Sequence, residues 1–250
     1  MRYNAVVDYI SKDYYQKMTF PGAHASASFQ QKILAEWLKR ITKTHSIKTI
    51  LDIGSGLGFN LPTLSHFCSQ VWSTDISPAA LQEAKKEHPN LKNIHYLVCD
   101  AQKIKFPNGY FDLVVCTEVL EHIQNQEKVI RGIVRILKPN GFLIISTPNY
   151  QNLTGLIKWY KDKKAKRECW EPWEAHRGGL EKRMTPGIIQ KLLSGPFRII
   201  KTRGANYLLA WLYFLPLRQY YDLFPFLTLG EVPFIKKFGM QYYILAQKND

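Results

Sequence analysis

The sequence predicts an α/β fold in which a parallel sheet carries helices on both faces. Strand-like and helix-like patterns alternate along the chain, as they do in such sheets. The first strand-like run, residues 50–53, stops at three glycines with the spacing G-x-G-x-G. Two later strand-like runs end in acids, Asp75 and Asp100. Ligands bind at the carboxyl ends of the strands in open α/β sheets, so we expect a site at that edge.

A helix is expected before the first strand. Apolar residues recur at helical spacing within residues 28–44, namely Phe29, Ile33, Trp37 and Ile41. The stretch before it, residues 8–27, is rich in aromatic residues, including Tyr9, Tyr14, Tyr15 and Phe20. These tyrosines either form a lid over a cofactor or cover the helix, and the sequence leaves both roles open.

The loop after the first strand allows a ligand to approach the backbone closely. Its glycines, at positions 54, 56 and 58, permit a tight turn, and residues 60–69 can start a helix. Nucleotide-like cofactors dock against such a strand–loop–helix unit. A dinucleotide fingerprint would need glycine where the chain has Phe59, and a P-loop would need a lysine that does not follow Gly58.

The second strand is expected at residues 71–75. Its last residue, Asp75, lies 21 positions after Gly54. An acid at about this distance can accept hydrogen bonds from a ribose, although it could also be a surface acid at a strand end. Ser77 and Pro78 then predict a helix start, with the serine as N-cap and the proline at the first helical position.

Further strand-like runs follow along the chain. A turn at residues 139–141 should precede the fifth strand, and Thr185 should cap a helix over residues 188–193. The expected strands three to seven are residues 94–101, 110–116, 142–149, 196–203 and 240–247.

These motifs resemble one family. Residues 51–58 resemble the glycine loop, hxDxGxGxG, of S-adenosylmethionine-dependent methyltransferases of the Rossmann-like class. Residues 111–123 and 137–149 look like the corresponding segments of ubiquinone and menaquinone methyltransferases. The resemblance covers residues 45–150 well, and beyond them only a short echo near Met184 and a final strand. It implies a doubly wound, mostly parallel seven-stranded sheet with an antiparallel last strand and a cap or insertion.

The resemblance also implies the cofactor, S-adenosyl-L-methionine, and its product, S-adenosyl-L-homocysteine. In this reading Asp100 binds the adenine amino group and Ala101 contacts the ring, although Asp100 could also be a turn residue. The implied cofactor-binding residues are Asp52, Gly54, Ser55, Gly56, Gly58, Asn60, Asp75, Ile76, Asp100, Ala101 and Thr117.

Methyl transfer from a sulfonium is an in-line displacement that mainly requires alignment of the acceptor and exclusion of water. A general base helps where the acceptor is a hydroxyl or an acidic carbon. One candidate is His122, after strand four, whose alternative role is a cofactor contact or a helix cap. The other is His176, in the expected cap, which could instead be a surface histidine. No metal-ligand spacing such as H-E-x-x-H occurs, and no metal is expected.

The 250 residues suffice for one methyltransferase domain with a substantial core. We expect an N-terminal helical lid over 1–44, a cofactor-binding core over 45–150, and acceptor-side cap insertions over 151–195 and 204–239. The four cysteines form no C-x-x-C pair, which favours a reduced, cytoplasmic chain. The N-terminus lacks the apolar region of a signal peptide.

The second part of the chain is basic and contains an apolar segment. The net charge is +14, and residues 158–167 hold the densest basic cluster. That cluster is either a solvated helix face or a surface for anionic lipid or nucleic acid. The apolar run at 207–217 is shorter than the roughly 20 residues that span a bilayer. It indicates an interfacial helix or hydrophobic cap, or else packing on the sheet or in a homodimer.

The main functional hypothesis is therefore methyl transfer to a small, hydrophobic or lipid-like acceptor, with peripheral contact at a membrane surface left open. One alternative is an RNA methyltransferase that uses the basic C-terminal half. The other is a non-catalytic, methyltransferase-like subunit that supports a partner.

Overall fold

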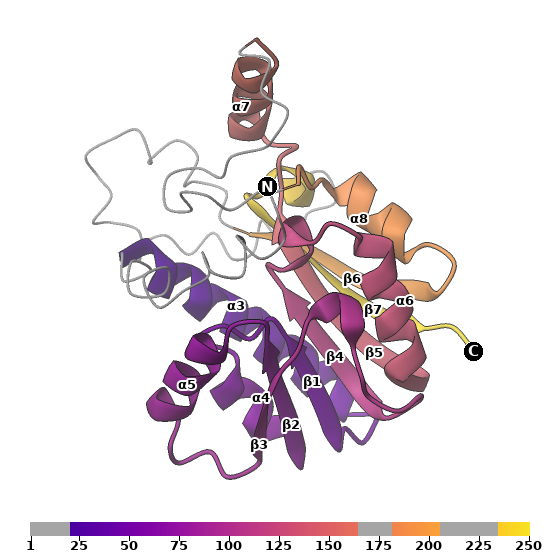
Figure 1. The fold of residues 1–250 in the computed structure, drawn as a ribbon. Helices are drawn as coiled ribbons and strands as arrows, with labels where there is room; N and C mark the ends of the chain where they lie inside the picture. The colour runs from indigo at the N-terminus through magenta and orange to yellow at the C-terminus, as the bar shows by residue number, and fades with distance from the viewer. Residues whose placement is uncertain (1–20, 165–181, 206–234) are drawn as a thin grey trace.

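A computed structural model describes residues 21–164, 182–205 and 235–250, and it contains a seven-stranded sheet (Figure 1). The strand order is β3-β2-β1-β4-β5-β7-β6. Strand β7 is antiparallel to both of its neighbours, while the other six strands run in one direction. The mostly parallel sheet with an antiparallel last strand is thus confirmed. The strands are β1 Thr49–Ile53, β2 Gln70–Asp75, β3 Ile94–Val98, β4 Phe111–Thr117, β5 Leu137–Pro148, β6 Phe197–Ala205 and β7 Gln241–Lys248.

Helices cover both faces of the sheet, as expected. One face packs against α3, α4 and α5, and the other packs against α6 and α8 (Figure 1). Helix α7 stands away from these layers. The α-helices are α3 Pro21–Thr42, α4 Leu61–Phe67, α5 Pro78–Glu87, α6 Gln126–Ile136, α7 Leu153–Lys164 and α8 Pro186–Leu193. Short 3₁₀ helices are η1 Ala101–Lys103, η2 Leu120–His122 and η5 Ile235–Phe238.

The core has two halves because successive strand residues point to opposite faces. In the central strands, Leu113 and Ile144 lie in the cluster beneath α3, while Val114 and Leu143 lie in the cluster beneath α6. All four are buried. Coverage of both faces explains why the central strands read as continuous apolar runs rather than alternating ones.

The helix expected before the first strand is present as α3. Ile33 and Trp37 are fully buried beneath it, as their helical spacing predicts. Its polar side is tied to the far edge of the sheet, where Glu36 accepts hydrogen bonds from Lys201 at 2.9 Å and Arg203 at 2.6 Å. Helix α3 therefore bridges the sheet from β1 to β6.

Both predicted helix starts are confirmed by their caps. The Ser77 side chain accepts a hydrogen bond from the backbone of Ala80 at the start of α5. The Thr185 side chain accepts one from the backbone of Ile188 at the start of α8. In each case a proline follows the cap at the first helical position, where its missing N–H costs nothing.

The fifth strand begins earlier than expected. Helix α6 ends at Ile136, and pairing starts at once, with Leu137 opposite Phe111. The expected turn at 139–141 lies inside the strand as an irregular segment, where Asn140 has a positive φ of 58°. Strand β4 begins at Phe111 and offers a pairing partner there, so β5 starts at Leu137, ahead of the turn residues.

Several sequence-based expectations fall outside the described residues. They concern the N-terminal tyrosines, His176, and the apolar run at 207–217, which lie in 1–20, 165–181 and 206–234. Over the described part of the chain, no helix combines the length and apolar character needed to cross a membrane.

Asp112 fastens the start of β1 to β4 and β5. Its Oδ2 accepts backbone hydrogen bonds from Lys48 and Thr49, both at 2.9 Å. Its Oδ1 accepts one from the Lys138 ammonium at 2.6 Å. Burial raises the pKa of Asp112, but the bonds from Lys138 and from the two backbone groups outweigh it, so the pKa is lowered. The ionised carboxylate is thus the form that stabilises the fold.

We expect Asp112→Asn to lower the free energy of unfolding by about 1–3 kcal/mol at pH 7, because a charged acceptor of several hydrogen bonds is lost. A group with a lowered pKa stabilises the fold above its unfolded pKa of about 4, and this stabilisation is lost as the pH falls through the folded pKa. Urea denaturation at pH 7 and pH 3 measures the effect. An equal loss of unfolding free energy at both pH values would contradict the stabilising role of the ionised carboxylate.

Candidate functional site

The glycine loop between β1 and α4 adopts a backbone that side chains disfavour. Gly54, Gly56 and Gly58 have φ values of 68°, 52° and 76°. A Cβ atom on Gly54 would lie 2.4 Å from Cγ2 of Val119. One on Gly58 would lie 2.7 Å from Cδ1 of Leu61. The glycines therefore allow both the left-handed turn and the close approach of the segment after β4.

Asp75, at the end of β2, holds this loop in place. Its Oδ2 accepts a hydrogen bond from the Gly56 backbone, and its Oδ1 accepts one from the Ser77 backbone, both at 2.9 Å. Burial raises the pKa of Asp75, and the bonds from Ser77 and Gly56 offset this only in part. The backbone of Ile76 also donates to this carboxylate, so three of its four lone-pair sites are used within the protein. The ribose contact expected from the sequence stays a prediction.

The loop is also bonded to β2 through Ser55. Its backbone N–H donates to the carbonyl of Thr74 at 2.9 Å, and its hydroxyl lies 2.7 Å from that of Ser73. The sequence suggested Ser55 as a cofactor contact. The structure adds that the side chain is buried and hydrogen-bonded within the protein.

Asp52, on β1, is the unusual ionisable group of the site. It is fully buried, and neither carboxylate oxygen has a hydrogen-bond partner among the described residues. Burial raises its pKa to about 8, with a smaller contribution from the charge of Asp75. The side-chain amide of Asn60 lowers the pKa of Asp52, which offsets part of this rise. The hydrogen bond that this amide donates is nevertheless to the Thr117 hydroxyl, at 3.2 Å. A buried acceptor without a partner indicates a missing donor or cation.

A polar network joins the loop, β4 and the N-terminal helix. Gln30 of α3 donates to the Asn60 side chain at 2.8 Å and to the Thr117 hydroxyl at 3.1 Å. Its neighbour Gln31 donates to the carbonyl of Phe59. The sequence suggested Asn60 and Thr117 but not Gln30, because nothing in a helical pattern shows which polar residue faces a distant loop.

The end of β3 contributes Asp100 and Ala101. Asp100 caps η1, where its Oδ1 accepts a hydrogen bond from the Gln102 backbone at 2.8 Å. The turn role considered for Asp100 is therefore present, and its contact with an adenine stays a prediction. The backbone of Cys99 donates to the carbonyl of Asp75, which places the ends of β2 and β3 side by side. Ile76 and Ala101 are both half-buried there.

The segment after β4 carries strain and acidic side chains. Glu118 has a positive φ of 56°, and its side chain accepts a hydrogen bond from the Ser146 hydroxyl at 2.6 Å. Such a conformation in a non-glycine residue costs of order 1–3 kcal/mol and is concentrated at functional sites. His122 follows in η2, one-third exposed, with Nε2 3.8 Å from Oε1 of the buried Glu121. The carboxylate can therefore orient the imidazole.

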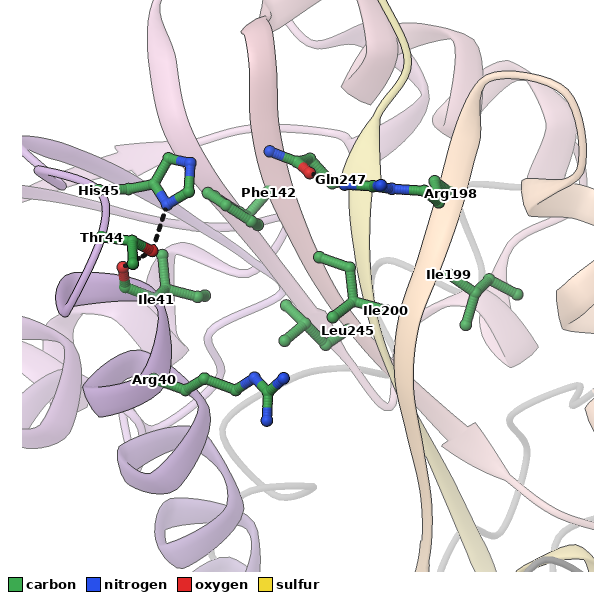
Figure 2. Close-up of a pocket in the computed structure, with 10 residues that line it drawn as sticks. All are labelled: Arg40, Ile41, Thr44, His45, Phe142, Arg198, Ile199, Ile200, Leu245 and Gln247. Carbon is green, nitrogen blue, oxygen red and sulfur yellow. Dashed lines mark hydrogen bonds between the residues drawn. The ribbon is translucent and has the colours of Figure 1, made fainter.

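A cavity of about 380 Å³ opens away from this edge, between α3 and the strands β5, β6 and β7 (Figure 2). It contains none of the residues that the sequence suggested for the cofactor. Arg198, on its rim, already donates to Gln247 at 2.7 Å. The functional site is thus set by the loop chemistry and not by this cavity, which is lined by Arg40, Ile41, Thr44, His45, Phe142, Arg198, Ile199, Ile200, Leu245 and Gln247.

Comparison with known proteins gives one consistent family. Residues 51–145 match the family model described as a methyltransferase domain. Over 115 residues, the chain is 34% identical to the mitochondrial ubiquinone biosynthesis O-methyltransferase of Schizosaccharomyces pombe, with 44% of this chain and 41% of that protein covered. The family-model match, residues 51–145, contains the glycine loop, Asp75 and η2.

Residues 51–145 therefore form a methyltransferase domain, and the relatives that share it include a protein named as a probable S-adenosylmethionine-dependent methyltransferase. The chain spans less than half of the length of the curated relatives it matches. The family uses S-adenosylmethionine as methyl donor, as the resemblance implied.

Solved structures confirm the fold of the methyltransferase domain. A candidate methyltransferase of Haloferax volcanii, in complex with the Trm112 methyltransferase activator, aligns with a TM-score of 0.68 at 16% identity, covering 98% of both chains. The N-methyltransferase NodS of Bradyrhizobium japonicum, in complex with S-adenosyl-L-homocysteine, aligns with a TM-score of 0.60 at 14% identity, covering 99% of this chain and 97% of that one.

A pair of glycine substitutions tests the geometry of the loop. Gly54 and Gly109 both have positive φ, but a Cβ atom on Gly109 would meet nothing within 4 Å. We expect Gly109→Ala to cost about 1 kcal/mol of stability from backbone strain alone. Gly54→Ala should cost about 2 kcal/mol or more, because it also displaces Val119. Urea denaturation measures both, and equal losses would contradict the close approach.

Proposed function

We propose that this chain transfers a methyl group to a small, hydrophobic or lipid-like acceptor by in-line displacement. The observation that carries the proposal is the buried, partnerless carboxylate of Asp52 beside the glycine loop. When bound, S-adenosylmethionine supplies a methyl group activated by a sulfonium, and it also carries an ammonium group. A cationic ligand of this kind matches a site in which the buried Asp52 carboxyl has no hydrogen-bond partner.

The residues that would hold the cofactor lie on adjoining strand ends. The backbone of the glycine loop would approach it closely, Asp75 would accept a hydrogen bond from one hydroxyl group, and Asp100 would lie at the neighbouring end of β3. These strands adjoin at the carboxyl edge, where doubly wound sheets bind ligands. The protein part of the reaction is to orient the two reactants and to exclude water.

His122 is our candidate for the general base. It lies exposed after β4, and Oε1 of Glu121 lies 3.8 Å from its Nε2. The carboxylate would orient the ring, and the imidazole would accept a proton from an acidic acceptor. His176 stays a second candidate, outside the described residues.

The hydrophobic acceptor is supported by the relatives and not by a described cavity. The Schizosaccharomyces pombe protein acts in ubiquinone biosynthesis, and a quinone precursor is a hydroxyl-bearing, apolar acceptor. A partner subunit is a second candidate function, favoured by one observation. The Haloferax volcanii protein that matches this chain over 98% of its length was solved with an activator protein.

We expect Asp52→Asn to separate stability from cofactor binding. The folded chain binds a proton at Asp52 up to a pH of about 8, whereas an unfolded aspartate loses it near pH 4. The raised pKa therefore lowers the free energy of unfolding of the ligand-free chain as the pH rises through this window. Removing the charge should raise that free energy at pH 8 by about 1–3 kcal/mol. Binding of S-adenosylmethionine should weaken about tenfold or more.

Urea denaturation and calorimetric titration measure these two effects on the same sample. Asp112→Asn is the matched control. It removes an aspartate whose pKa is lowered, and this aspartate lies at the start of β4, away from the strand ends that form the site. The control should lose stability and keep its affinity for the cofactor. An Asp52→Asn chain that is less stable and binds as before would contradict the proposal.

The reaction itself is tested with methyl-labelled S-adenosylmethionine and apolar acceptors that carry catechol or hydroquinone groups. We expect label in the organic phase only when enzyme and acceptor are both present. Label transferred to RNA would instead support the nucleic-acid alternative. A co-purifying protein, with no turnover on any acceptor, would support the non-catalytic, partner-subunit alternative.

A further inference from the structure

Helix α7 exposes a stripe of large apolar side chains. Leu156 is 45% exposed, Trp159 is 41% exposed and Tyr160 is 64% exposed. Their spacing of three and four residues places them on one side of the helix. We call these three residues the α7 stripe. Single exposed apolar residues are ordinary on protein surfaces, but three on one helical face indicate a contact surface.

The base of α7 is fixed to the methyltransferase domain by asparagines. The Asn152 side chain accepts a hydrogen bond from the Gly155 backbone at 2.7 Å and donates to the carbonyl of Asn149 at 2.8 Å. Asn149 in turn donates to the carbonyl of Gly239 at 2.7 Å. The helix therefore leaves the sheet at a defined point, directly after β5, and projects away from the body (Figure 1).

Cations flank the stripe. The ammonium of Lys163 lies 5.2 Å from the centroid of the Trp159 ring, and the guanidinium of Arg183 lies 5.6 Å from it. Lys163 and Lys164 are both exposed. Tryptophan and tyrosine beside basic residues are typical of helices that lie in the interface of an anionic bilayer. The net charge of +14 adds long-range attraction to such a surface.

We propose that the α7 stripe docks on an anionic membrane surface, with its apolar side chains in the acyl boundary and its cations at the lipid headgroups. The charge complementarity is that of Lys163, Lys164 and Arg183 with acidic lipids. Nucleic acid is the weaker match, because Leu156 has no ring face on which a base could stack. The helix starts at the carboxyl end of β5, so docking brings the cofactor edge towards the bilayer. Any access that docking gives to an apolar acceptor rests on the proposed function, whereas docking itself does not.

Co-sedimentation of the full chain with vesicles tests the proposal. One set of vesicles contains phosphatidylcholine alone, and the other contains about one-third phosphatidylserine. We expect binding to the anionic vesicles, reduced about tenfold or more by a triple change to serine at Leu156, Trp159 and Tyr160. Lys163→Gln with Lys164→Gln should reduce binding about fivefold for each charge, since one lysine near an anionic surface contributes about 1 kcal/mol.

The matched control is Leu97→Ser with Val98→Ser, two exposed apolar residues on the edge strand β3 at 40% and 53% exposure. This control should bind vesicles like the unaltered chain. Equal binding by the stripe variant, or equal loss in the control, would overturn the proposal. The proposal would also be overturned if the unaltered chain did not bind vesicles but bound RNA with a steep salt dependence, and the stripe variant lacked this RNA binding.

A second measurement keeps docking and catalysis distinguishable. The stripe variant should bind S-adenosylhomocysteine and methylate a water-soluble acceptor like the unaltered chain, because none of its changes lies in the cofactor site. Vesicle binding without turnover on any acceptor would leave docking standing and refute the proposed function. A variant that loses cofactor binding together with vesicle binding would show that the changes damage the fold, and the two lysine changes then decide whether docking holds.

Discussion

The structure depends on a backbone segment that only glycines allow. Gly54 and Gly58 turn the chain sharply after β1, and Asp75 fixes the turn by accepting the N–H of Gly56. This bond joins the first strand's loop to the end of the second strand. The ends of β1, β2 and β4 then converge at one edge of the sheet, which is the arrangement on which the site is built. Loss of the turn would displace the loop residues proposed to hold the cofactor.

The second feature of the site is a stability cost that function explains. Asp52 is buried without a described partner and Glu118 holds a left-handed backbone conformation. Neither arrangement benefits the ligand-free protein, since an unpaired buried carboxylate and a strained backbone both disfavour the folded state. Sites that violate local rules in this way are where a ligand is expected to supply the missing interaction. The contrast with Asp112 is informative, because that aspartate has all the partners that Asp52 lacks.

Much of the fold follows from local patterns, and much of the site does not. The strands, the caps at Ser77 and Thr185 and the glycine loop were predictable because periodicity, capping chemistry and glycine geometry act over a few residues. The long start of β5 was not predictable, because pairing with β4 overrides the turn residues there. Gln30 was missed for a related reason. Its contact with Asn60 crosses 30 residues and depends on how α3 lies on the sheet.

The central claim is that the glycine loop, Asp52 and Asp75 form a binding site for S-adenosylmethionine and its product. Calorimetric titration of the ligand-free, folded chain with S-adenosylhomocysteine tests it most directly, since the measurement needs neither an acceptor nor a membrane. The account predicts saturable binding at a single site per chain. A sample shown to be folded by circular dichroism that gives no binding heat at several temperatures would contradict it.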